Sequence, residues 1–212
     1  METVRTVIRT VEGLKTSDGA GVSLKRIIGS PELDYLDPFL LLDEFSSDNP
    51  DDYMAGFPPH PHRGFETVTY MLQGKFQHKD SAGNEGLLTS GSVQWMTAGR
   101  GVIHSEMPEQ VEGMVRGFQL WINLPKELKM TEPAYQDIPS KKIPEVCEEG
   151  VSVRVITGQY VGVSGPASAK TGMLYLDIHL DKESDFNHSI AKGWNCFLYV
   201  YDGLVHVDDQ DE

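Results

Sequence analysis

The stretch GFPPHPHRGFETVTYMLQG, residues 56–74, decides the fold class of this chain. Its first part places His60 and His62 two residues apart in a segment that we interpret as an extended strand. Successive side chains of a strand point to opposite faces, so both imidazoles should point to the same face. Its second part, residues 65–72, carries the alternating apolar pattern of another strand, and glycines mark the turns on either side.

Similar short alternating segments recur along the chain and predict an all-β fold. The 21 glycines and 12 prolines are scattered between them, which favours tight turns over long helices. Turn sequences at residues 73–75, 82–85 and 89–91 predict hairpins between consecutive strands. In this first half we expect strands at residues 4–11, 22–28, 39–42, 65–72, 86–89, 93–97 and 115–124.

A proline-rich connector separates this series from a second one. Residues 125–146 contain four prolines and one predicted helical turn at residues 126–130. Four further strands are expected, whereas a closed small barrel needs about eight, so the second module should be incomplete. We therefore predict an N-terminal metal-binding domain at residues 1–130, followed by a linker and partial second domain at 131–212. The four strands are expected at residues 151–157, 173–180, 195–201 and 205–207.

Charge and composition exclude several classes of function. A formal net charge of -14 argues against direct nucleic-acid binding, because phosphate neutralisation needs clustered Lys and Arg. Nothing approaches the roughly 20 apolar residues that span a bilayer, and the first residues do not resemble a leader, so we expect a soluble protein made in the cytosol. Cys147 and Cys196 form neither a zinc pattern nor a disulfide framework, and we expect reduced thiols.

A second histidine segment turns the first into a candidate metal site. GRGVIHSE, residues 99–106, repeats the two-residue spacing with His104 and Glu106. Two such strands facing each other would bring together four ligands, namely His60, His62, His104 and Glu106. Three imidazoles and one carboxylate leave one or two positions open on octahedral Fe(II), Mn(II) or Ni(II), and zinc is less favoured. Each short pattern alone often occurs without metal, but the two together favour a shared site.

Other residues near these segments receive provisional roles. Glu66 is predicted to share the strand parity of His60 and His62, as an alternative ligand or as a partner that orients a ligand. Gly99 and Gly101 should permit a close approach of the second ligand strand. The remaining histidines lack a partner at ligand spacing and are expected to face solvent without a role: His78, His179, His188 and His206.

Four longer segments carry a family resemblance: LDPFLLLDEF at 36–45, FPPHPHRGFETVTYMLQG at 57–74, QWMTAGRGVIHSEMP at 94–108 and QLWINLP at 119–125. They resemble the hallmark segments of the pirin family, and the resemblance runs to about residue 207. Pirins are bicupins, so it implies a cupin barrel followed by a second barrel that is incomplete here. The family's metal ligands fall on His60, His62, His104 and Glu106, which weakens the case for Glu66 as a ligand.

The resemblance also implies two functions of different classes: we expect an iron-dependent transcription co-regulator that can also have flavonol dioxygenase activity, and the alternative is a protein that is primarily a flavonol dioxygenase. Animal pirins resemble nuclear iron proteins that bind Rel-type (NF-κB) transcription factors, with the Fe(II)/Fe(III) state as a switch, which places such a protein in nucleus and cytoplasm. Several pirins resemble quercetin 2,3-dioxygenases, in which Glu106 or Glu66 would be the catalytic base towards a flavonol. In a third alternative the metal only stabilises the barrel.

The resemblance further implies that a pirin continues beyond the last residues of this sequence. Pirins normally run for roughly another third of their length and complete the second barrel. The strands expected near residues 195–207 would then have unpaired edges. We therefore expect lowered stability or self-association of the C-terminal half.

Overall fold

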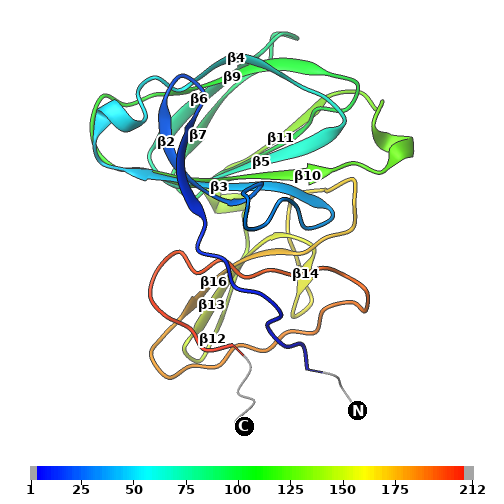
Figure 1. Cartoon of the computed structure of the whole chain (residues 1–212). Coiled ribbons are helices and arrows are strands. Elements are labelled where there is room, and N and C mark those ends of the chain that lie inside the picture. Colours follow the sequence, from blue (N-terminus) through cyan, green and yellow to red (C-terminus); the bar gives the residue numbers. More distant parts are fainter. Residues whose placement is uncertain (1–3, 208–212) are drawn as a thin grey trace.

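The computed structural model describes residues 4–207, so the ends of both predicted domains, residues 1–3 and 208–212, lie outside it. Two β modules lie one above the other in the view of Figure 1. Within residues 4–207 the only helices are single 3-10 turns at Pro50–Asp52, Lys126–Leu128 and Ser140–Lys142. None of them has the length or apolar character needed to cross a membrane. The predicted turn after residue 125 is confirmed, although it is shorter than expected.

A seven-stranded antiparallel sheet forms one wall of the first module. Its strand order is β1-β2-β3-β10-β5-β8-β11. The bounds are β1 Leu14–Asp18, β2 Val22–Ile28, β3 Phe39–Ser47, β5 Phe65–Gln73, β8 Val93–Thr97, β10 Val115–Asn123 and β11 Ala134–Ile138. Because β11 pairs with β8, this sheet extends past the domain boundary predicted at residue 130.

A four-stranded sheet forms the opposite wall, in the order β4-β9-β6-β7. Its strands are β4 Phe57–His62, β6 Lys75–Asp80, β7 Glu85–Thr89 and β9 Val102–Pro108. Of the three predicted hairpins, only the turn at residues 82–85 joins paired strands, β6 and β7. The turns at 73–75 and 89–91 instead carry the chain from one sheet to the other, which is how two short sheets enclose a barrel.

Apolar residues cover both faces of the seven-stranded sheet. One cluster, which includes Phe45, Met71 and Phe76, fills the barrel interior. A larger cluster on the other face includes Trp95 and Phe118, and it also contains buried residues of the second module. The central strand β5 is therefore buried at almost every position rather than at alternate ones.

The second module is built on three strands, β12 Glu145–Glu148, β13 Val151–Thr157 and β16 Tyr175–Leu180, in the order β12-β13-β16. A two-stranded ribbon, β14 Gln159–Tyr160 and β15 Val163–Ser164, accompanies them. These strands do not close a barrel. Cys147 and Cys196 are exposed free thiols, as expected.

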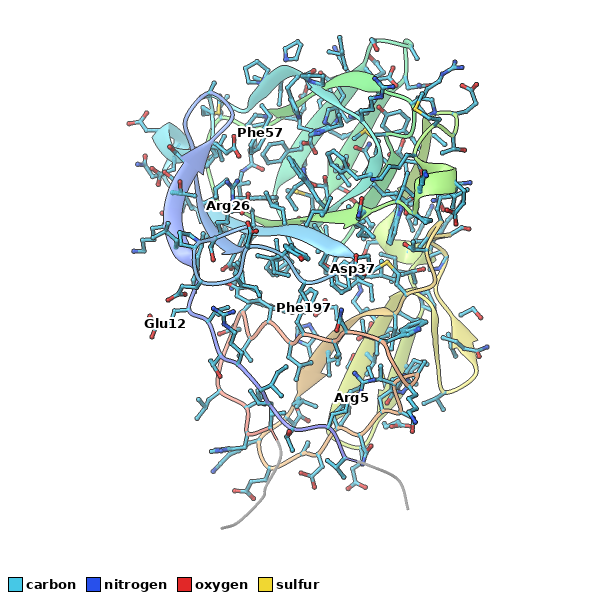
Figure 2. The ribbon with its side chains drawn as sticks, turned by 45° about the vertical axis from the view of Figure 1, so that its right-hand side comes forward. Arg5, Glu12, Arg26, Asp37, Phe57 and Phe197 are labelled. Atoms are coloured by element: carbon cyan, nitrogen blue, oxygen red, sulfur yellow. The ribbon has the colours of Figure 1, made fainter. Side chains whose placement is uncertain are left out.

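Three predicted strands are wrong: residues 4–11, 195–201 and 205–207 pair with no sheet. Residues 195–201 are nonetheless extended, and their alternation turns Phe197, Tyr199 and Tyr201 onto the seven-stranded sheet. The Phe197 ring meets the Phe39 ring edge-on at 4.9 Å, between the two modules (Figure 2). The alternating apolar side chains of this segment are buried because the segment packs on the face of a sheet, although it forms no hydrogen-bonded pairing along a sheet edge.

Candidate metal centre

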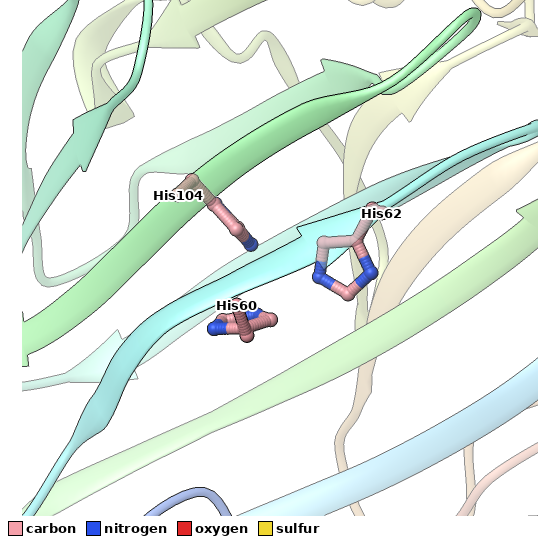
Figure 3. Close-up of side chains that lie close together, drawn as sticks. All are labelled: His60, His62 and His104. Carbon is pink, nitrogen blue, oxygen red and sulfur yellow. The ribbon is translucent and has the colours of Figure 1, made fainter.

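Strands β4 and β9 bring three imidazoles together. They are antiparallel neighbours, with His60 directly opposite His104. The predicted spacing therefore places His60, His62 and His104 on one face, although the two strands lie side by side instead of facing each other across the barrel. One ring nitrogen from each histidine lies within 4.8 Å of the others (Figure 3).

The protonation of these rings suits a metal ligand. Burial, followed by the neighbouring His104 and His60, lowers the pKa of His62 to about 3. Burial, followed by His60 and His78, likewise lowers the pKa of His104 to about 3. Both rings are therefore neutral at pH 7 and keep one lone pair each, as metal ligation requires. His60 Nδ1 lies 2.8 Å from the carbonyl oxygen of Pro58 and donates a hydrogen bond to it. The lone pair of His60 Nε2 therefore remains available for a metal ion.

An unsatisfied buried atom provides a separate test of fit. His104 Nε2 is buried and has no hydrogen-bond partner among the residues that the structure describes. A buried polar atom without a partner costs about 1–3 kcal/mol, so such an atom calls for an explanation. A divalent transition metal held by three imidazole nitrogens would satisfy it, and the residues present fit such an ion.

Glu106, the fourth predicted ligand, lies on the same face of β9 as His104 and is 4% exposed. Its two oxygens accept hydrogen bonds from Thr69 Oγ1 at 2.9 Å and from Gln119 Nε2 at 3.0 Å. The close group of ligand atoms contains the three histidines without Glu106. Each oxygen retains a lone pair, and ligation by Glu106 stays a prediction.

Glu66 lies elsewhere. Its oxygens accept hydrogen bonds from Thr97 Oγ1 at 2.6 Å and from the backbone N–H of Lys170 at 3.2 Å, on the side of β5 that faces the second module. The parity argument fails because Gly64, at φ +82°, separates β4 from β5, and these strands belong to different sheets. The roles predicted for Glu66 thus lose their geometric basis.

His60 and His62 line a cavity of about 570 Å³, within the usual range of small-molecule pockets. Aromatic rings from Phe57, Phe65 and Trp121 line it, together with Glu106. At its polar side lie Asp18 and Asp43, which share Arg26: the guanidinium donates to Asp43 at 2.9 and 2.7 Å and to Asp18 at 2.7 Å. These three residues carry no recognisable pattern in the sequence and were not predicted.

His78 is the clearest correction among the histidines. It was expected to face solvent, yet it is 1% exposed and its Nδ1 lies 3.4 Å from His104 Nδ1. Burial lowers its pKa, although Glu106, Asp137 and Asp80 act in the opposite direction. His179 and His206 are exposed as predicted, whereas His188 is half-buried 5.3 Å from the Tyr160 ring.

Comparisons with known proteins identify the family of this chain. The Pirin family profile matches residues 21–122. A pirin-like protein of Caulobacter vibrioides is 50% identical over 207 residues, which cover 96% of this chain and 75% of that protein. Human Pirin is 44% identical over 212 residues, which cover 100% of this chain and 71% of that protein. This chain belongs to the pirin family.

Among solved structures, a quercetin 2,3-dioxygenase from Acinetobacter baumannii matches this pirin with a TM-score of 0.71 and 38% identity. The match covers 78% of this chain and 60% of that chain. The predicted fold, a cupin barrel followed by an incomplete second barrel, is thereby confirmed.

Proposed function

We propose that this pirin holds one iron ion through His60, His62, His104 and Glu106 and uses it with dioxygen to open the central ring of a flavonol, as a quercetin 2,3-dioxygenase. The observation that carries the proposal is a close group of three imidazoles, two of which, His60 and His62, line an aromatic-lined cavity of about 570 Å³. Four protein ligands leave one or two positions of an octahedral ion open, and a catalytic ion needs such a position for substrate or dioxygen.

The side chains of the cavity divide the work. Bound iron supplies a Lewis acid and a redox centre that allows dioxygen to react with the flavonol. Phe57, Phe65 and Trp121 offer ring faces and edges on which a flat aromatic molecule packs. Glu106 accepts the proton of the flavonol hydroxyl as general base, while Thr69 and Gln119 fix its orientation.

Turnover by metal-loaded protein tests this proposal. Protein loaded anaerobically with Fe(II) should consume quercetin and dioxygen together, and metal-free protein should consume neither. Glu106→Gln should lower turnover by about 100-fold or more at equal metal content, because it removes a general base. Glu66→Gln is the matched control, since Glu66 does not line the cavity. Unchanged turnover in both variants would refute the role of Glu106 as general base. The absence of turnover by the iron-loaded wild type would refute the proposed dioxygenase activity.

A second candidate is a redox-sensitive co-regulator of Rel-type (NF-κB) transcription factors, acting in nucleus and cytoplasm. Two observations favour it: 44% identity to human Pirin along the whole chain, and a net charge of -14 that suits a basic protein partner. Oxidation of Fe(II) to Fe(III) would add one positive charge inside a poorly solvated cavity. That charge would shift the conformation of a nearby loop or of a partner-binding surface. A pull-down with a Rel-type factor in each oxidation state tests it, and equal binding in both removes the switch.

A metal with a purely structural role would give a different pattern. Chelation would then lower the melting temperature without altering quercetin turnover or partner binding. Other divalent ions such as Mn(II) and Ni(II) should be compared with iron in the same melting experiment, because the ligand set also suits them.

A further inference from the structure

A second buried imidazole touches the candidate ligand His104. His78 comes from β6, which pairs with β9 so that His78 stands opposite Glu106 and Asp80 opposite His104. The two Nδ1 atoms of His78 and His104 lie 3.4 Å apart, at the long end of the hydrogen-bond range. Both Nε2 atoms are buried and without a partner among the described residues.

This contact constrains which nitrogen of each ring carries a proton. A neutral imidazole has one N–H donor and one acceptor nitrogen, so two facing Nδ1 atoms form a hydrogen bond only when one of them is protonated. A metal on His104 Nε2 needs the lone pair of that atom, which moves the His104 proton to Nδ1. His104 Nδ1 then donates to His78 Nδ1, and the proton of His78 lies on its Nε2.

We propose that His78 is a positioning residue that accepts a hydrogen bond from His104 and thereby fixes the tautomer and ring orientation in which His104 binds metal through Nε2. The inference rests on the proposed metal site and is independent of the substrate or partner. Groups that orient a metal-bound histidine in this way typically contribute about 10–100-fold in metal affinity.

The surroundings of His78 hold its ring in place for this role. The Tyr135 ring lies 4.6 Å from it, and Tyr135 belongs to β11, the last strand of the opposite sheet. On its own sheet, β6 lies between β9 and β7. The ring thus lies between Tyr135 of one wall and His104 of the other, and these contacts favour the orientation in which Nδ1 faces His104.

Two variants separate the hydrogen bond from the packing. His78→Phe keeps a ring of similar size and removes the acceptor, whereas His78→Asn keeps an acceptor oxygen close to the place of Nδ1. Affinity is measured for Co(II), whose absorption bands report the number of ligands, by competition with a chromogenic chelator. We expect His78→Phe to bind Co(II) about 10–100-fold more weakly. His78→Asn should recover most of that loss.

Nitrogen NMR of the wild type loaded with Zn(II) provides a readout that needs no variant. The expected spectrum has His104 protonated on Nδ1 and His78 protonated on Nε2. Wild-type affinity in His78→Phe, or a His104 ring without a proton on Nδ1, overturns the inference while the metal site stands. Failure of the wild type to bind either Co(II) or Zn(II) overturns both the inference about His78 and the proposed metal site. Thermal unfolding of the metal-free variants shows whether a loss of affinity reflects a loss of fold.

Discussion

Gly99 offers a sharp test of how the metal centre is supported. It lies in the turn between β8 and β9 at φ +50°, a conformation that L side chains rarely adopt. A Cβ at this position would lie 2.1 Å from the carbonyl oxygen of Thr131. The same turn is tied to the first ligand strand, because the Gly99 carbonyl accepts a 2.8 Å hydrogen bond from the N–H of Gly64, two residues after His62.

The expected cost of Gly99→Ala has two parts. A left-handed conformation costs an alanine about 1–2 kcal/mol. The clash is with backbone, which cannot rotate away as a side chain could, so overpacking adds about 1–3 kcal/mol. Gly83→Ala is the matched control, because Gly83 also has a positive φ but nothing within 4 Å of its Cβ. The excess of Gly99→Ala over Gly83→Ala should therefore be about 1–3 kcal/mol.

Urea unfolding of the metal-free variants measures this excess. With a slope of about 2 kcal/mol per molar, the midpoint of Gly99→Ala should lie roughly 0.5–1.5 M below that of Gly83→Ala. Metal affinity should fall only in Gly99→Ala, because the displaced turn moves both ligand strands. Equal midpoints for the two variants would show that the close approach of Thr131 to Gly99 does not limit stability. An unchanged metal affinity in Gly99→Ala would show that this turn does not position the metal ligands.

Three further perturbations address the rest of the molecule. Tyr70→Phe removes the hydroxyl that donates to Asp177 at 2.5 Å and accepts from Arg154 at 2.5 Å between the modules, and it should cost about 1–3 kcal/mol in urea unfolding. The second perturbation is Asp18→Asn. Partial burial raises the pKa of Asp18, but hydrogen bonds from Arg26 and the Gly19 N–H outweigh it and lower this pKa below its ordinary 3.8. The wild type should therefore be more stable than Asp18→Asn in urea unfolding above pH 4, by less than about 1 kcal/mol because the ion pair is half-exposed. This difference should disappear as the pH falls through the lowered pKa of Asp18. Replacing the exposed Leu198 and Val200 with serine should reduce any self-association seen by light scattering, and a wild type that stays monomeric would contradict that expectation.

Local periodicity was sufficient to predict the ligand strands, because the geometry that matters there spans only two residues. His60 and His62 share a face in any extended strand, and the same holds for His104 and Glu106. The sequence did not show which sheet each strand would join. Turns at residues 73–75 and 89–91 have the composition of hairpins, yet they connect different sheets. Composition reports the local backbone conformation, whereas the sheet that a strand joins depends on the packing of the whole barrel.

Two histidines with the same local pattern show this limit most directly. His78 in KFQHKD and His179 in YLDIHL both occupy strands, and nothing in either segment distinguishes them. His78 is buried because β6 is an inner strand whose face closes the barrel, while His179 is exposed because β16 is an edge strand of the second module. Burial is what turns an ordinary imidazole into a partner for His104, since only a ring shielded from water must find its hydrogen bonds among its neighbours. The position that we propose for His78 beside the candidate metal centre is therefore set by long-range pairing, and in this barrel it can be identified only after the register of β6 against β9 is known.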